Sequence, residues 1–354
     1  MFKSFLRAMS VAMLIVGTVI GAGFASGKEV VAFFGAVPNV FTALITGVLV
    51  FMCSTLFLFV GRRVKKTDTG EVNGEVFGKL RPLADIFMLF NSVTVLGAML
   101  AGVDSLAAEF IDIRPVASIV VGLLCAVVAV RGINGVIKAN AVLVPIMVVF
   151  LCVCSVLAID FPLKAQSGGI NVYNVLLYVS MNMILGGGVL TTVHKLSPRE
   201  IILSSAVASV VIAGLLLCIM GALQSTSAAK ADMPMLLIAL KSGRATYFIG
   251  LPVIAASIFT TMLAAFKSVY DYVLGIFKYK IVAAGVVLIA GLVVGAFGFS
   301  AVVETLYPVT GILGMLYLAC NLWYLIRTRV KRKVKTKAKR VRSKLTKKRA
   351  DVSV

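Results

Sequence analysis

Long apolar segments, separated by short polar connections, occupy most of this sequence. An α-helix needs roughly 17–25 apolar residues to cross the hydrocarbon core of a bilayer. A segment inside lipid must also satisfy its own backbone hydrogen bonds, which favours helices. Ten segments meet the length requirement, at about 9–35, 40–60, 83–109, 115–131, 139–159, 171–193, 200–222, 246–270, 281–298 and 302–326. The sequence therefore predicts an all-α integral membrane protein with ten transmembrane helices.

The composition agrees with this fold class and excludes a soluble globular domain. Hydrophobic residues make up 60% of the chain and charged residues 14%, and the mean hydropathy is +1.05. A cleaved signal peptide is an alternative for the N-terminus, because Lys3 and Arg7 precede an apolar run. That run continues through Phe33-Phe34. It is too long for a signal peptide, so we expect a transmembrane segment there.

The sequence shows no residue pattern that is typical of an enzyme or a metal protein. It has no Walker loop, no His/Cys cluster and no spacing that pairs a nucleophile with a base. All six cysteines fall inside the apolar segments, and Cys152 and Cys154 point to different faces of a helix. We therefore expect no catalytic residue, no metal site and no disulfide framework.

Lysine and arginine are distributed unequally between the connections, and this asymmetry predicts the orientation in the membrane. With a cytoplasmic N-terminus, 15 basic residues of the body fall on the inside and 5 on the outside. We expect both termini on the cytoplasmic side of the cell (plasma) membrane. The one long external connection is 223–245, where Pro234 and the apolar run 235–240 predict a short re-entrant or lid helix.

A strongly basic tail follows the last apolar segment. Residues 327–349 contain 14 lysines and arginines, and the first acid is Asp351. Such a run repels itself and is usually disordered, so we expect 327–354 to be a disordered cytoplasmic tail that contacts anionic lipid. We do not expect nucleic-acid binding, because the tail has no aromatic residue on which a base could stack. The sequence does not indicate the oligomeric state.

The number of segments predicts an internal inverted repeat. Five segments are an odd number, so the second five must enter the membrane with the opposite orientation. The transporter domain would span 1–326, with one repeat at about 8–160 and the other at about 170–326. In such folds, the first segment of each half is a discontinuous helix around the binding site.

The first segment contains a clear interruption. Glycines at 21, 23 and 27 and Ser26 stand near its middle, followed by the charged pair Lys28-Glu29. Glycine costs roughly 1 kcal/mol relative to alanine in a helix, and a charge near the bilayer centre costs roughly 2.5–3.5 kcal/mol. Irregular backbone at this depth is tolerated where it is buried in protein or lines a cavity. We expect a discontinuous helix here.

The sixth segment has a glycine triplet, Gly186-Gly187-Gly188, with Asn182 shortly before it. Glycine also serves close helix packing in membranes, which is an alternative reason for the triplet. Because it matches the interruption of the first segment, we expect helix six to be discontinuous as well. Asn182 would either bind the substrate or make an interhelical hydrogen bond.

A broken helix exposes opposite poles of the peptide group. The first half ends in free carbonyls, which attract a cation, and the second begins with free N–H groups, which attract an anion. We expect free carbonyls at about 19–22 and free N–H groups at about 25–28, with the Ser26 hydroxyl as an N-cap. These poles fit a zwitterionic amino acid, or a carboxylate with a coupling ion. The candidate substrate-binding residues are Gly21, Ala22, Gly23, Ser26, Gly27, Asn182, Gly186, Gly187 and Gly188.

The run Gly-Ala-Gly-Phe-Ala-Ser-Gly-Lys-Glu at 21–29 resembles the signature of the YkvI-type membrane proteins. These are candidate amino-acid permeases of the amino acid–polyamine–organocation superfamily, which has the LeuT-like five-plus-five fold. The number of segments and the positions of the interruptions resemble this family over roughly 5–326. The run at 21–29 is the specific motif. The resemblance implies an alternating-access carrier with its substrate at helices one and six, and it implies no particular substrate.

The resemblance also implies a position for a coupling ion. In LeuT-like sodium symporters, one ion lies between carbonyls of the first helix and hydroxyls of the eighth. The matching residues here are Gly17 or Ile20 with Thr260 and Thr261. Proton-coupled relatives place a lysine nearby instead, and Lys138 is too close to the cytoplasmic end of its segment for that role. Sodium and the proton both stay open, and no other cofactor is implied.

Charged and aromatic residues near the interruptions have competing explanations. Lys28 and Glu29 either neutralise each other or point to different partners, since neighbours on a helix do not face one another. Glu29 is the candidate for binding a proton or a cationic group. Tyr173 and Tyr178 either anchor the segment in the interface or gate the site.

These features predict a secondary active transporter of a small amino-acid-like solute, coupled to sodium or protons. The alternative is a membrane receptor or sensor that keeps the same pocket and does not transport. An ion channel is not favoured, because no continuous polar row along the segments would line a pore.

Overall fold

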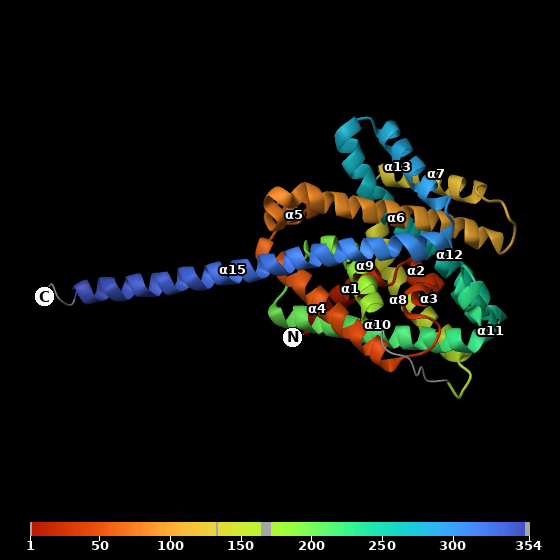
Figure 1. Cartoon of the computed structure of the whole chain (residues 1–354), viewed down its shortest axis with the longest axis horizontal. Helices are drawn as coiled ribbons and strands as arrows, with labels where there is room; N and C mark the ends of the chain where they lie inside the picture. The colour runs from red at the N-terminus through yellow and green to blue at the C-terminus, as the bar shows by residue number, and fades with distance from the viewer. Residues whose placement is uncertain (1, 132–133, 164–170, 351–354) are drawn as a thin grey trace.

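Helices make up all the regular secondary structure in the residues that the computed structural model describes, 2–131, 134–163 and 171–350. Figure 1 shows a bundle in which helices from the two halves of the chain alternate, with one long helix projecting from it. The elements are α1 (Phe2–Val19), α2 (Ala22–Ser26), α3 (Lys28–Phe34), α4 (Val40–Val64), α5 (Thr69–Phe77), η1 (Gly78–Leu80), α6 (Arg81–Ala108), α7 (Val116–Arg131), α8 (Asn134–Ala158), α9 (Val172–Leu190), α10 (Pro198–Thr226), η2 (Ala228–Lys230), α11 (Pro234–Ser242), α12 (Arg244–Phe277), α13 (Lys280–Gly295), α14 (Phe299–Ala301), the π-helical turn η3 (Val302–Leu306) and α15 (Tyr307–Ala350).

Within the described residues, six helical segments are long and apolar enough to cross a membrane. They are α4, Thr69–Ala108, α9, α10, α12 and Phe299–Arg329, and three shorter apolar helices are α7, Val142–Ala158 and α13. Each apolar segment predicted from the sequence overlaps a helix. The all-helical prediction is confirmed, while the number of ten crossings and the five-plus-five division stay predictions.

Side chains at the helix starts explain where several helices begin. Asn39 accepts a hydrogen bond from the Thr42 N–H (3.1 Å) at the start of α4. Ser197 and Glu200 form a capping box at the start of α10, in which the Glu200 carboxylate accepts from the Ser197 N–H (2.7 Å). Each of these bonds satisfies a backbone donor that the helix itself leaves free.

Glycines bring helices into close contact, both within the second half of the chain and between the two halves. A Cβ atom on Gly311 of α15 would lie 2.7 Å from the Leu177 carbonyl oxygen of α9. In the same way, a Cβ on Gly47 of α4 would lie 3.2 Å from the Ser209 carbonyl oxygen of α10. Small residues at helix interfaces let backbones approach closely where no hydrophobic effect drives association.

The glycine triplet of the sixth segment lies inside a continuous helix, so the prediction of a discontinuous helix six is wrong. Helix α9 runs from Val172 to Leu190 without interruption. A Cβ on Gly186 would lie 2.8 Å from Thr18 Oγ1, one on Gly187 2.6 Å from Phe57 Cζ, and one on Gly188 2.9 Å from Met88 Cε. The triplet thus faces α1, α4 and α6 in turn, and it is glycine because three neighbours leave no room for a side chain.

The basic tail differs from our expectation of disorder. Helix α15 continues past the last apolar residues to Ala350 and projects from the bundle (Figure 1). Lysine and arginine are good helix formers, and extending a nucleated helix costs little. Residues 351–354 lie outside the described residues, and the division of the chain at 326/327 stays a prediction.

The connection 223–245, which we predict to be external, contains the expected short helix. Helix α11 buries Pro234, Met235, Leu236, Ile238 and Ala239. At its end, the Ser242 hydroxyl donates to the Cys154 carbonyl of α8 (2.7 Å). This helix therefore lies against the bundle rather than standing free of it.

Candidate functional site

The first segment is interrupted where the glycines predict it, and it breaks twice. Helix α1 ends at Val19, and Gly21 is extended (φ −85°, ψ −172°) before α2 begins. Gly27 separates α2 from α3 with φ +84°, a left-handed conformation that glycine adopts without steric cost. The discontinuous first helix is confirmed, with the five-residue helix α2 as an island between the two breaks.

The peptide groups at these breaks are paired differently from our expectation. The N–H groups of Ala25 and Gly27 donate to the carbonyls of Gly21 (2.9 Å) and Phe24 (3.0 Å). The Lys28 N–H donates to the Ser26 hydroxyl (3.3 Å), which itself donates to the Gly23 carbonyl (2.8 Å). The expectation of free N–H groups from 25 to 28 is therefore wrong, because α2 closes as a helix of its own.

Ser26 does bind a backbone N–H at the start of a helix, as expected, although Gly27 is the N-cap position of α3. The sequence predicts free carbonyls at about 19–22. The Gly21 carbonyl instead accepts from the Ala25 N–H (2.9 Å). The carbonyls of Val19 and Ile20, at the end of α1, have no following helical turn to pair with and no backbone hydrogen bond among the described residues.

Two helices of the second half enclose the island α2. The Thr261 hydroxyl of α12 lies 3.9 Å from the position of a Cβ on Gly21. A Cβ atom on Gly27, at the other end of α2, would lie 3.1 Å from Pro234 Cβ and 3.1 Å from Met235 Cγ of α11. All five residues of α2 are buried, so the irregular backbone is enclosed by protein, as a break at membrane depth requires.

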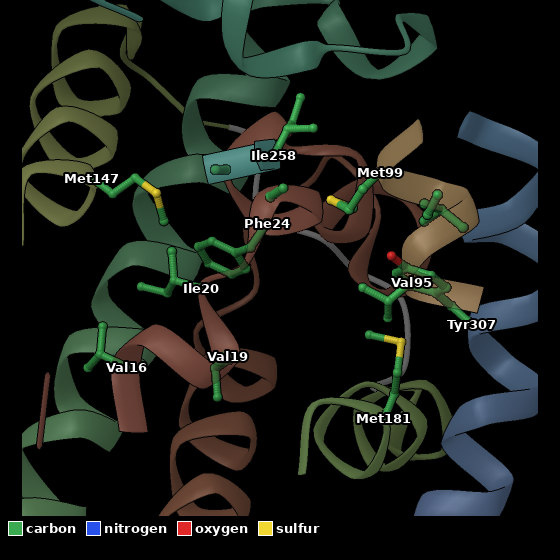
Figure 2. Close-up of a cluster of buried hydrophobic side chains, with 14 of the residues drawn as sticks. Val16, Val19, Ile20, Phe24, Val95, Met99, Met147, Met181, Ile258 and Tyr307 are labelled. Carbon is green, nitrogen blue, oxygen red and sulfur yellow. The ribbon is translucent and has the colours of Figure 1, made fainter. Parts of the chain in front are cut away.

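Figure 2 shows a cluster of buried apolar side chains that come from separate elements and include Phe24 of α2. We call this set the central cluster. Val95 and Met99 stand four residues apart on one face of α6. All its members belong to the buried core of the protein: Phe24, Val95, Met99, Met147, Met181, Ile258 and Tyr307.

The structure brings together only part of the expected ion-coupling set. Thr261 lies beside Gly21, as described above, whereas the Thr260 hydroxyl donates to the Ser257 carbonyl of its own helix (3.2 Å). Gly17 is packed against α8, where a Cβ would lie 2.8 Å from Val144 Cγ2. Ile20 is buried in the core. A cation site formed by these residues stays a prediction.

Lys28 and Glu29 have different surroundings, which decides between the two explanations for this pair. The Lys28 ammonium lies 3.0 Å from Glu304 Oε1 of η3, and its side chain is 6% exposed against 53% for Glu304. The Glu29 carboxyl instead turns back toward α2, where its Cδ lies 2.5 Å from the position of a Cβ on Gly23. Because Gly23 has no side chain, the Glu29 carboxyl can occupy the space beside it.

Tyr178 is buried at the centre of the protein, while Tyr173 is not. Tyr173 is 55% exposed, which fits an interfacial anchor, and Tyr178 is 0% exposed. The Tyr178 ring contacts Phe33 (5.5 Å between centroids) and Phe34 (4.8 Å) of α3. Asn182 donates its side-chain amide to the Tyr178 carbonyl of its own helix (3.0 Å). This bond lies within one helix, rather than between helices as the alternative for Asn182 supposed.

Sequence reasoning missed the contributions of α6 and α15 to the central cluster. Val95, Met99 and Tyr307 lie in segments that are apolar on every face, so no periodicity marks the inward side. One signal was available in Asn91, one turn from Val95 on the same helix face. Asn91 is fully buried, and its side-chain amide has no hydrogen-bond partner among the described residues.

Comparison with known proteins gives distant relatives. No family model matches the chain. It is 24% identical over 339 residues to an uncharacterized membrane protein of Bacillus subtilis (strain 168), YkvI, and the match covers 89% of this chain and 95% of YkvI. It is 25% identical over 338 residues to the uncharacterized protein YyaD of the same organism, with 88% of this chain and 95% of YyaD covered.

Two solved structures share the fold. The inward-facing conformation of Mhp1 has a TM-score of 0.60 at 13% identity and covers 87% of this chain and 73% of its own. A substrate-bound, outward-open Na+-coupled sialic acid symporter has a TM-score of 0.53 at 13% identity, covering 90% and 78%. At these identities the likeness shows the fold alone, and that fold is the LeuT-like fold that the resemblance implied.

Proposed function

Because this chain is a YkvI-like multi-pass membrane protein with the LeuT fold, we propose that it is a secondary active transporter of a small amino-acid-like solute. The observation that carries the proposal is the island helix α2, buried between α11 and α12 with a break at each end. Such a break weakens a helix and offers peptide groups to a ligand. A membrane anchor would gain nothing from it.

The solute would bind at the first break, next to the central cluster. The α1 carbonyls before Gly21 attract a positive group, while Phe24, Val95 and Met99 provide an apolar surface beside them. This combination suits a small molecule with one charged end and one apolar end. The residues of 21–27 are the proposed substrate-binding set, and Asn182 is a further candidate on α9.

The proposed mechanism is alternating access in a ten-helix, five-plus-five bundle with cytoplasmic termini in the cell membrane. On the predicted outer side, the ion pair of Lys28 with Glu304 joins α3 to η3. Separating Glu304 from a buried ammonium leaves an unpaired charge, which is costly unless water replaces the carboxylate. Because Glu304 is half-exposed, outward movement of η3 would admit that water, so this pair is the proposed outer gate.

We also propose that a cation drives transport. Thr261 lies beside Gly21, and the carbonyls of Gly17 and Ile20 are the other oxygens expected from the resemblance. Carbonyl and hydroxyl oxygens suit Na+ as hard ligands. Omitting Na+ from the transport assay distinguishes sodium coupling from proton coupling, since only sodium coupling loses uptake.

A thermal-shift screen of the purified full-length protein tests whether it binds such a solute. The compounds are the amino acids, small amines and small carboxylates, each with and without Na+. A ligand at 100 times its Kd stabilises the folded state by about 2.7 kcal/mol. No shift with any compound of the three classes would contradict the proposed function.

Counterflow in liposomes then separates a carrier from a receptor. Vesicles loaded with the unlabelled hit are diluted into labelled solute, and a carrier accumulates label transiently by exchange. Protein-free vesicles provide the baseline. A protein that binds the hit but gives the baseline signal would be a receptor with a transporter fold.

A further inference from the structure

Glu29 is a buried carboxyl group without a partner. Its residue is 5% exposed, and its Oε2 atom makes no hydrogen bond to any group in the part of the chain that the structure describes. The adjacent lysine does not neutralise it, because the Lys28 ammonium contacts Glu304. Buried charges in proteins are normally paired or hydrogen-bonded. An unpaired one inside a protein therefore points to a ligand.

Among the described residues, no charged side chain on the main elements packed against α3 is available to Glu29. Those elements are α2, α9, α10 and η3, and their described charged residues are Glu304 on η3 and Arg199 and Glu200 on α10. Glu200 accepts a hydrogen bond from Ser4, near the start of α1 (2.8 Å). Ser4 lies roughly 25 Å from the break along α1. The first turn of α10, which contacts Ser4, is therefore far from Glu29.

The groups near the Glu29 carboxyl are aromatic. The Tyr178 hydroxyl is fully buried, and the Asn182 side chain of the same helix lies beside it. Tyr178 and Tyr307 both lie within electrostatic range of Glu29. Phe33 and Phe34 contact the Tyr178 ring from α3. A carboxyl group bordered by aromatic rings is an arrangement that binds organic cations, because a cationic ligand pairs with the carboxylate and ring faces attract a cation as well.

We propose that Glu29, together with the Tyr178 hydroxyl and the neighbouring rings, binds the ammonium group of the transported solute. The solute is then an organic amine whose apolar part contacts the central cluster. This assignment rests on the proposed function and narrows it: a positive amino group is required, and a carboxylate is not. Gly23 is part of the site, since it leaves the space in which the carboxyl stands.

The experiment compares probes that share one apolar group and differ in the charged end. Isoamylammonium, isoamyl alcohol, 4-methylpentanoate and leucine carry the same branched chain with a positive, a neutral, a negative and a zwitterionic end. Methylammonium and phenethylammonium, each with its alcohol, extend the series to smaller and larger groups. Binding is measured by thermal shift and calorimetry on the full-length protein in nanodiscs.

At least one amine is expected to bind, with its alcohol and the matching acid binding at least tenfold more weakly. Glu29→Gln keeps the shape and removes the charge, and the Kd for the amine should rise on the order of 30-fold or more. Glu109→Gln makes the same change on the exposed end of α6 and should leave that Kd unchanged. Tyr178→Phe should weaken binding less than Glu29→Gln.

Three results would overturn the assignment. They are an alcohol that binds as well as its amine, an amine that binds equally to Glu29→Gln, and carboxylates that bind while all amines fail. The last result leaves the transporter proposal intact, whereas failure of every compound class contradicts both. A Glu29→Gln protein that does not fold would show that Glu29 has a structural partner, which also overturns the proposal. We expect that variant to be at least as stable as the wild type.

Discussion

At the scale of single residues, the three glycines of the first segment serve three different purposes. Gly27 adopts a left-handed conformation that other residues resist. Gly23 makes room for the Glu29 carboxyl, and Gly21 provides the extended backbone between α1 and α2. A single substitution at each position therefore tests a different property of the site.

Gly27→Ala should destabilise the protein by two separable effects. A left-handed residue other than glycine costs roughly 1–2 kcal/mol, and the new Cβ would also lie 3.1 Å from both Pro234 and Met235. The two effects are separated by a double-mutant cycle with Met235→Ala, which removes one of the two side-chain atoms nearest the new methyl group. Gly27→Ala should lower the thermal midpoint less in the Met235→Ala background than in the wild type, because only the backbone cost and the Pro234 contact remain. An equal loss in both backgrounds would show that Met235 of α11 does not press on the break.

Gly23→Ala should impair ligand binding more than folding. The added methyl group would meet the far end of the Glu29 side chain, which can move, so the fold should survive. The displaced carboxyl would leave its present position, and the Kd of the best ligand from the screen should rise at least tenfold. Unchanged binding in calorimetry would remove Gly23 and its neighbours from the pocket.

At the scale of helices, glycine has opposite effects in the two halves of the chain. Around 21–27 the glycines interrupt the helix, whereas the triplet 186–188 leaves α9 intact and brings it close to three neighbours. The difference comes from the surroundings. Helix α9 is held on one side by α15, where Gly311 allows close approach to the Leu177 backbone.

Gly311→Ala should be strongly destabilising, although it adds only one methyl group. The new Cβ would lie 2.7 Å from a carbonyl oxygen and 3.0 Å from the Cα of Leu177. Backbone atoms cannot rotate away, and overpacking costs about 1–3 kcal/mol. Gly285→Ala on α13 is the control, since nothing lies within 4 Å of that position. We expect Gly285→Ala to be neutral or stabilising in thermal unfolding, and a similar loss in both variants would contradict the packing role of Gly311.

At the scale of the whole molecule, the helices of the two halves interleave. Helix α1 contacts α9 and α10, and α6 contacts α12 and α13, so neither half folds around a core of its own. The Arg63 guanidinium of α4 donates to the Thr328 carbonyl of α15 (2.5 Å). This bond ties the start of the basic extension to the body.

The orientation of the molecule can be tested with C-terminal reporter fusions. Green fluorescent protein after Val354 should fluoresce, and alkaline phosphatase at the same position should be inactive, because we expect the C-terminus in the cytoplasm. A fusion after Thr226, truncated there, should show the reverse pattern. The opposite result at both positions would invert the predicted topology.

The extended basic helix should bind anionic lipid. Each basic residue near an anionic surface contributes about 1 kcal/mol. A synthetic peptide of residues 327–354 should therefore sediment with vesicles containing phosphatidylserine and not with phosphatidylcholine vesicles, and high salt should release it. Binding that is independent of lipid charge would contradict this role.

Local sequence signals predicted part of the site and failed for the rest. The break at 21–27 was predictable because glycine and serine weaken a helix wherever they occur. The same reasoning was wrong for 186–188, because the residues that pack against these glycines are distant in the sequence. It left open the partners of Lys28 and Glu29, because Glu304 lies far away in the chain.

The sequence by itself determined the helical membrane class, the position of the first break and the short helix α11. These follow from segment length, residue propensity and charge, which are properties of neighbouring residues. Only the tertiary structure decided that α9 is continuous, that Lys28 and Glu29 separate, and that Val95, Met99 and Tyr307 join Phe24 in one buried cluster. In a segment that is apolar on every face, contacts with distant helices determine which side faces the core. The sequence of such a segment has no periodicity that predicts that side.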